Sequence, residues 1–142
     1  MTESPKTDAA VELSMYEQFG GHEFFVALIG DFYVGVAQDP VIRPLYPEED
    51  LGPAEERFRL FIEQYWGGPT TYSQTRGHPR LRLRHGPFEI DERARDHWLL
   101  HMRDALDGRE LSPELDEQMW TYLVTAAHAM VNTHETLRPP KP

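Results

Sequence analysis

The sequence contains no cysteine among its 142 residues, which excludes disulfides, thiolate nucleophiles, zinc ribbons and iron–sulfur clusters. Long hydrophobic runs are also absent. The longest unbroken apolar stretch covers 24–30, far short of the roughly 20 residues that a membrane-spanning helix needs. Residues 1–14 include no apolar region that resembles a secretion signal. We therefore expect no integral membrane segment, and the cytoplasm is the expected compartment.

Positive charge is scarce, with 14 Lys and Arg against 24 Asp and Glu and a formal net charge of −10. A protein that binds nucleic acid non-specifically needs a cationic surface, so no nucleic-acid partner is expected. Hydrophobic residues make up 39% of the chain, including 7 Phe, 6 Tyr and 3 Trp, which is enough to build a core. The length suits one domain, predicted at 14–133 between flexible segments at 1–13 and 134–142.

The spacing of apolar residues is helical almost throughout, and it predicts an all-α fold of about six helices without a sheet. Helices are expected over 15–19, 22–38, 53–66, 91–107 and 113–132, with short turns over 41–46 and 80–84. Residues 69–79 are expected to form a long loop. The helix over 53–66 is expected to bury Ala54, Phe58, Phe61, Ile62 and Tyr65, and to turn Glu55, Glu56, Arg59 and Glu63 towards solvent.

A cationic segment interrupts the acidic sequence, because residues 69–88 include four arginines and no acidic residue. These are Arg76, Arg80, Arg82 and Arg84. The segment is either a local patch without a ligand or a site for an anion: a nucleic-acid phosphate, a small phosphate ligand or carboxylates such as haem propionates. The net charge disfavours the first of these anions.

Several side chains could carry chemistry, although each also has an ordinary structural explanation. His85 ends a short turn beside Leu81 and Leu83, where a neutral imidazole could ligate an iron porphyrin or could simply be a surface or core histidine. His97 and His101 lie one helical turn apart and could chelate a metal. No third ligand follows at a recognisable spacing, so surface histidines are the favoured interpretation.

Three aromatic residues with polar tips, Tyr33, Tyr46 and Trp98, are ordinary core residues when each is taken alone. Together with Ala54 and Phe58 they could form a pocket with several hydrogen-bond donors. No nucleophile–base or phosphate-binding motif such as GxSxG, HExxH, GxGxxG or a P-loop is present.

The segment 45–88 is the most distinctive part of the sequence, and it resembles a group II (O-type) truncated haemoglobin. The motifs that carry the resemblance are LYPEED, EQYWGGP and RGHPRLRLRHGPF, and the likeness extends over 19–128. It implies a two-over-two helical sandwich around haem. His85 matches the proximal iron ligand, whereas Tyr33, Tyr46 and Trp98 match residues on the distal side that stabilise the ligand. In this likeness Ala54 occupies the position of the distal histidine of myoglobin-like globins. Phe58 lies one turn later, where the resemblance leads us to expect the smaller leucine.

The same resemblance implies which residues hold the cofactor. Those expected to contact the haem disc or its propionates are Ala54, Arg57, Phe58, Phe61, Tyr72, Arg76, His78, Leu81, His85, Phe88, Ile90 and Trp98. Without cysteine the haem is held non-covalently, as haem b. The cationic segment then gains a role in binding propionates.

The function implied is reversible binding of O₂ and of other diatomic ligands such as NO and CO. An indole N–H can only donate, so Trp98 should favour O₂ over neutral CO, and several donors should make O₂ release slow. NO detoxification or peroxidase-type chemistry would additionally need a reductase or peroxide, and the residues do not choose between them. The alternative is a haem-free all-α interaction module that binds an acidic partner through its Arg-rich loop. Whether the protein is a monomer or a homodimer is left open.

Overall fold

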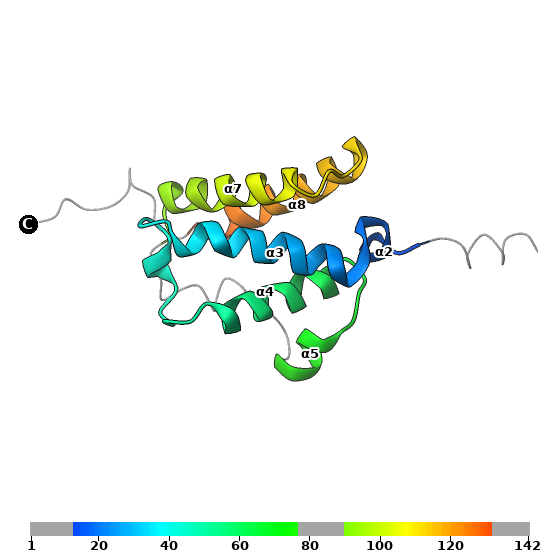
Figure 1. The fold of residues 1–142 in the computed structure, drawn as a ribbon, viewed down its shortest axis with the longest axis horizontal. Helices are drawn as coiled ribbons and strands as arrows, with labels where there is room; N and C mark the ends of the chain where they lie inside the picture. Colours follow the sequence, from blue (N-terminus) through cyan, green and yellow to red (C-terminus); the bar gives the residue numbers. More distant parts are fainter. Residues whose placement is uncertain (1–12, 77–89, 132–142) are drawn as a thin grey trace, which may run out of the picture.

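The computed structural model describes residues 13–76 and 90–131. These residues form helices joined by short turns, and none of them belongs to a strand (Figure 1). The elements are α2 (Met15–Phe19), α3 (Gly21–Ala37), the 3-10 helix η1 (Arg43–Leu45), α4 (Gly52–Tyr65), α5 (Thr71–Arg76), α7 (Glu92–Asp107) and α8 (Pro113–Met130). The all-α prediction is thus confirmed. Among the described residues, no helix is both long and apolar enough to cross a membrane.

Local sequence signals account for several helix ends. Ser14 forms a capping box with Glu17 at the start of α2, and the side chains of Asp91 and Ser112 cap α7 and α8. Gly20 separates α2 from α3 with a φ of 128°, a backbone conformation that residues with a Cβ rarely adopt. The predicted helix boundaries in these regions agree with the structure to within two residues.

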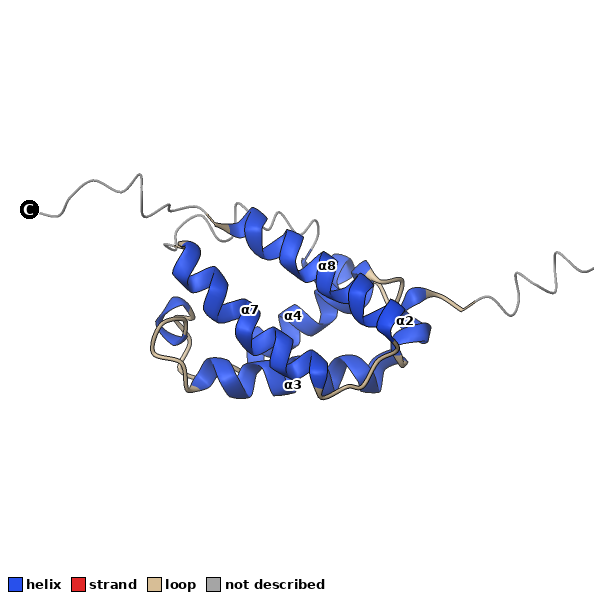
Figure 2. Ribbon diagram, turned by 90° about the horizontal axis from the view of Figure 1, so that it is seen from above, coloured by secondary structure: helices blue, strands red, loops and turns tan. Residues whose placement is uncertain are grey.

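The four long helices form two packed pairs, the two-over-two sandwich that the resemblance implies. Helix α3 packs against both α4 and α7, and α7 packs against α8. Figure 2 shows α7 lying between α3 and α8. The core is built from fully buried side chains of all four helices: Phe25, Leu28, Ile29, Phe32, Val36, Ile62, Met102, Leu106, Met119 and Leu123.

The expectation of a continuous loop over 69–79 is wrong in part, because residues 71–76 form α5. Tertiary contacts stabilise this short helix. The side-chain amide of Gln64 both accepts from the Ser73 backbone N–H, at 2.9 Å, and donates to the Ser73 hydroxyl, at 2.6 Å. Tyr72 is buried and its ring lies 5.5 Å from that of Phe61. Both partners belong to α4, so no local pattern predicts them.

The expected faces of α4 are wrong at two positions near its C-terminus. Glu63, assigned to solvent, is 2% exposed and accepts hydrogen bonds from His22 Nδ1 at 2.8 Å and Arg59 Nη1 at 3.2 Å. Tyr65, assigned to the core, is 54% exposed and stacks on Tyr122 at 4.1 Å between ring centroids. A buried carboxylate is stable only where donors meet it, and one of these donors comes from a distant helix.

Candidate functional site

A cavity of about 480 Å³ lies among α3, α4, α7, α8 and the turn that contains η1. Nine of the residues singled out in the sequence line it: Tyr33, Tyr46, Ala54, Arg57, Phe58, Phe61, Tyr72, Ile90 and Trp98. The predicted residues His78, Leu81, His85 and Phe88 lie outside the described residues, as does the side chain of Arg76, the last residue of α5. The structure therefore brings together every predicted cavity residue whose side chain it describes.

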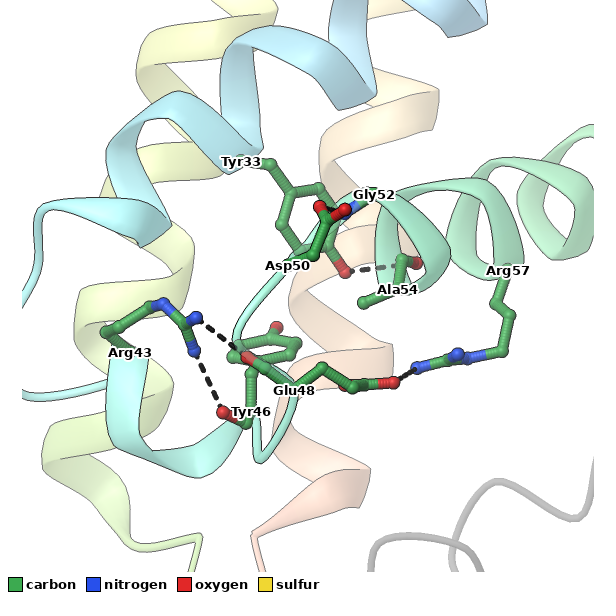
Figure 3. Close-up of polar contacts among 8 residues, drawn as sticks. All are labelled: Tyr33, Arg43, Tyr46, Glu48, Asp50, Gly52, Ala54 and Arg57. Carbon is green, nitrogen blue, oxygen red and sulfur yellow. Dashed lines mark hydrogen bonds and ion pairs between the residues drawn. The ribbon is translucent and has the colours of Figure 1, made fainter.

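Three hydrogen-bond donors converge at one side of this cavity. The ring centroids of Tyr33 and Tyr46 are 5.7 Å apart, and the Tyr33 hydroxyl lies 3.5 Å from the Ala54 carbonyl oxygen (Figure 3). Burial, followed by the neighbouring Tyr46 phenol, raises the pKa of Tyr33. Burial also raises the pKa of Tyr46, against the opposing effect of hydrogen bonds from Tyr33 and Trp98. Both phenols therefore keep their protons near neutral pH and remain donors.

Arg43 holds the turn that carries Tyr46. Its guanidinium donates to three backbone carbonyls, those of Tyr46 at 2.8 Å, Glu48 at 2.7 Å and Glu49 at 2.9 Å; Figure 3 shows the first two. These carbonyls belong to no helix, so they need donors from elsewhere. Sequence reasoning did not single out Arg43. An arginine among the mostly apolar residues 41–46 carries no local signal that it will fold back on the segment after it.

Two arginines border the cavity. Arg57 from α4 pairs with Glu48 at 2.7 Å (Figure 3) and is about one third exposed, so it reaches both the cavity and solvent. Arg95 from α7 also lines the cavity and pairs with its neighbour Asp96 at 3.0 Å. Arg95 was not predicted, because an arginine on a helix ordinarily faces solvent and its place in the sequence gave no sign of the cavity.

The walls are apolar and aromatic. Trp98 lies 5.2 Å from Phe32 and 6.0 Å from Phe58, measured between ring centroids. The last helix completes the wall with Tyr122, Leu123, Ala126, Ala127 and Met130, which the sequence analysis did not assign to the site. Their spacing along one face of α8 was the available signal.

His97 and His101, expected as surface histidines with metal chelation as the alternative, are part-buried and both contact the carboxylate of Asp39. No group of three or more potential metal ligands occurs in the described ranges 13–76 and 90–131. The two imidazoles therefore belong to a part-buried hydrogen-bonded cluster around Asp39, and neither is a free surface histidine.

The described residues of the cavity suit a flat apolar cofactor with carboxylate groups. The volume lies within the range of ordinary ligand sites, the walls are largely hydrocarbon, and the polar groups are few and convergent. The arginines at the border can pair with carboxylates. A two-over-two helical sandwich around such a cavity defines the class of a truncated globin with a haem pocket.

Comparisons with known proteins agree with this class. The family model described as bacterial-like globin matches residues 14–132. Group 2 truncated hemoglobin YjbI of Bacillus subtilis is 39% identical over 115 residues, which cover 81% of this chain and 86% of that protein. The crystal structure of a thermostable hemoglobin from Thermobifida fusca is 61% identical, with a TM-score of 0.84 over 85% of this chain and 98% of the other.

A structure described as a truncated oxygen-avid haemoglobin from Bacillus subtilis is 38% identical, with a TM-score of 0.79 over 84% of this chain and all of the other. The chain belongs to the bacterial-like globin family and is a group II truncated haemoglobin. As in that family generally, its function is haem-based binding of small diatomic ligands.

Proposed function

We propose that this protein binds haem b in the cavity and holds O₂ there with slow release. The observation that carries the proposal is the convergence of Tyr33, Tyr46 and Trp98 on one side of an apolar cavity. When bound, haem supplies an iron with an open coordination position for a diatomic ligand. The chain has no cysteine, so the cofactor is held without a thioether bond.

His85 is the proposed proximal ligand, on the strength of its place in the RGHPRLRLRHGPF motif. Phe58, Phe61, Ile90 and Trp98 would pack against the apolar disc, because all four line the cavity. Arg57 would face the propionates, as the sequence predicts. Arg95, which lines the cavity but was not predicted, would do the same. The proposed haem contacts also include Tyr72, Arg76, His78, Leu81 and Phe88.

The donors would act on the ligand according to its charge. An indole N–H donates and cannot accept, and phenols that keep their protons can donate as well. These groups would hold a ligand that carries partial negative charge, such as O₂, more firmly than CO. The Bacillus subtilis relative described as oxygen-avid supports slow release by analogy.

Slow release suits reactions on the held ligand better than rapid transport. NO oxidation to nitrate and peroxide-dependent oxidation are the candidate reactions, with a reductase or peroxide as the second reactant. Turnover assays with NO or peroxide would separate such an enzyme from a protein that only binds O₂.

The decisive test is the absorption spectrum of the purified protein. A Soret band is expected in the wild type, and His85→Ala should lose either the five-coordinate ferrous spectrum or the haem itself. His128→Ala, at an exposed position on α8, is the matched control and should keep the wild-type spectrum. No Soret band even after haem is supplied would favour the haem-free interaction module. Unchanged spectra in His85→Ala would transfer the proximal role to another residue, with His78 as the nearest candidate.

A further inference from the structure

Asp39 is one of two buried acidic residues among those described, with 6% of its surface exposed. It follows the end of α3, and its carboxylate has three partners. Oδ2 accepts from His97 Nδ1 at 2.8 Å and from His101 Nε2 at 2.7 Å, and Oδ1 accepts from the Val41 backbone N–H at 2.8 Å. Because an ionised carboxylate can only accept, both contacted imidazole nitrogens carry protons.

The backbone of Asp39 is also fully engaged. Its N–H donates to the carbonyl of Val36 in the last turn of α3, at 3.1 Å, and its carbonyl accepts from the Arg43 N–H at 2.9 Å. Asp39 is therefore the residue at which α3, the turn over 41–46 and α7 are joined by hydrogen bonds. Figure 1 shows α3 and α7 side by side, with the turn after α3 at the same end.

Each of the three joined elements carries one cavity donor. Tyr33 lies on α3, six residues before Asp39. Tyr46 follows η1, and the guanidinium of Arg43, the first residue of η1, donates a hydrogen bond to the Tyr46 carbonyl. Trp98 lies on α7 directly after His97 and one turn before His101. No single helix could set the relative positions of these three side chains, whereas a shared hydrogen-bonded residue can.

The contact between α3 and α7 at this point is close. A Cβ added at Gly35 would overlap the ring of His101, so the imidazole packs directly on the backbone of α3. The side chains of a helix lie about 5–6 Å from its axis, so rotating α7 by about 10° would move the Trp98 indole by roughly 1 Å. A hydrogen bond tolerates a donor–acceptor range of only about 0.5 Å, so such a rotation would break it.

We propose that Asp39, through His97 and His101, is a positioning residue for the cavity donors, and that it holds Trp98 in register with Tyr46 and Tyr33. It acts through α7 and does not touch the ligand. This inference rests on the proposed function only in that the donors are taken to face a haem ligand. The positioning of Trp98 can be tested without haem.

The test uses three variants of the full chain. His97→Leu/His101→Leu removes both donors to Asp39 and keeps apolar bulk. His97→Asn/His101→Gln restores them, because the amide nitrogen of Asn is as many bonds from the backbone as Nδ1, and that of Gln as many as Nε2. His22→Leu is the matched control, since it removes a histidine contact of the same length to the other buried carboxylate, Glu63.

Two measurements are made on each variant. The rate at which the Trp98 indole N–H exchanges with solvent is measured by NMR with and without haem, and it reports the hydrogen bonding of that group directly. Stopped-flow O₂ dissociation and the C–O stretching frequency of the CO-loaded protein report how the donors meet a ligand. In the Leu/Leu variant we expect indole exchange and O₂ dissociation each to rise by about 10-fold, the loss of one hydrogen bond to a charged or polar acceptor. The Asn/Gln variant should return both rates to within about 3-fold of wild type, and His22→Leu should change neither.

The proposal is overturned if the Leu/Leu variant keeps wild-type indole exchange and O₂ dissociation. It is overturned equally if the Asn/Gln variant behaves like Leu/Leu, because the hydrogen bonds to Asp39 would then not be the cause. If Leu/Leu does not fold, His97→Leu with His97→Asn as its rescue gives the same comparison while His101 still meets Asp39. A wild-type protein with no Soret band even after haem is supplied would refute the proposed function, and indole exchange in the haem-free chain would still decide this inference.

Discussion

Replacing Trp98 by phenylalanine isolates the contribution of one N–H donor to ligand retention. The side chain packs 5.2 Å from Phe32 and 6.0 Å from Phe58, so phenylalanine keeps much of the aromatic contact in the cavity wall. It removes the indole N–H, the hydrogen-bond donor that Trp98 offers to the cavity. The polar interaction is thus removed with little change in packing.

The magnitude follows from the strength of the bond. A hydrogen bond to a charged acceptor contributes about 1.5–3 kcal/mol. Because each 1.4 kcal/mol corresponds to a factor of ten, its loss should speed O₂ dissociation by roughly 10–100-fold. The association rate should change less, since the two remaining donors and the apolar walls still shape the cavity. CO carries little charge on its terminal oxygen, so its dissociation should change less than that of O₂.

Stopped-flow dissociation of O₂ and CO from Trp98→Phe measures both effects in the same protein. Trp120→Phe is the matched control, because Trp120 lies on α8 beneath the Arg103 guanidinium, 4.8 Å from it, and does not line the cavity. O₂ leaving Trp98→Phe at the wild-type rate would refute the reasoning. The ligand would then be held by Tyr33 and Tyr46, with Trp98 serving only to pack the wall.

Two further predictions concern α3 and the residue that follows it. Gly35→Ala should lower the free energy of unfolding by about 1–3 kcal/mol, because the new Cβ overlaps His101. Gly30→Ala on the same helix meets only Glu55 Oε2 at 3.5 Å and should raise it by up to about 1 kcal/mol; urea denaturation of both variants checks the opposite signs, and equal effects would contradict the argument. Burial alone would raise the pKa of Asp39, but hydrogen bonds from His97, His101 and the Val41 N–H hold that pKa well below its usual value of 3.8. A carboxyl with a lowered folded-state pKa stabilises the fold fully above its unfolded pKa and loses that contribution as the pH falls through the folded value. The stability difference between wild type and Asp39→Asn, measured by urea denaturation, should therefore shrink as the pH falls below about 4. A difference that grows below that pH would exclude this linkage.

Local sequence patterns determined the helices of this protein and much of its site. Caps such as Ser14, Asp91 and Ser112 act within a few residues, and apolar spacing marks a helix face without knowledge of its partner. The cavity donors were singled out by residue type and by the family resemblance, which the LYPEED segment around Tyr46 helps to carry. For these features the information lies within one or two helical turns of chain.

The tertiary structure decided the buried charges, because their partners are distant in the chain. Asp39 meets histidines 58 and 62 residues away, and Glu63 meets His22 across 41 residues. A charged side chain normally faces solvent, and only a donor brought by another helix makes its burial favourable. The spacing of apolar residues shows which face of a helix is buried. Which side chains lie opposite that face is decided only when the helices pack together.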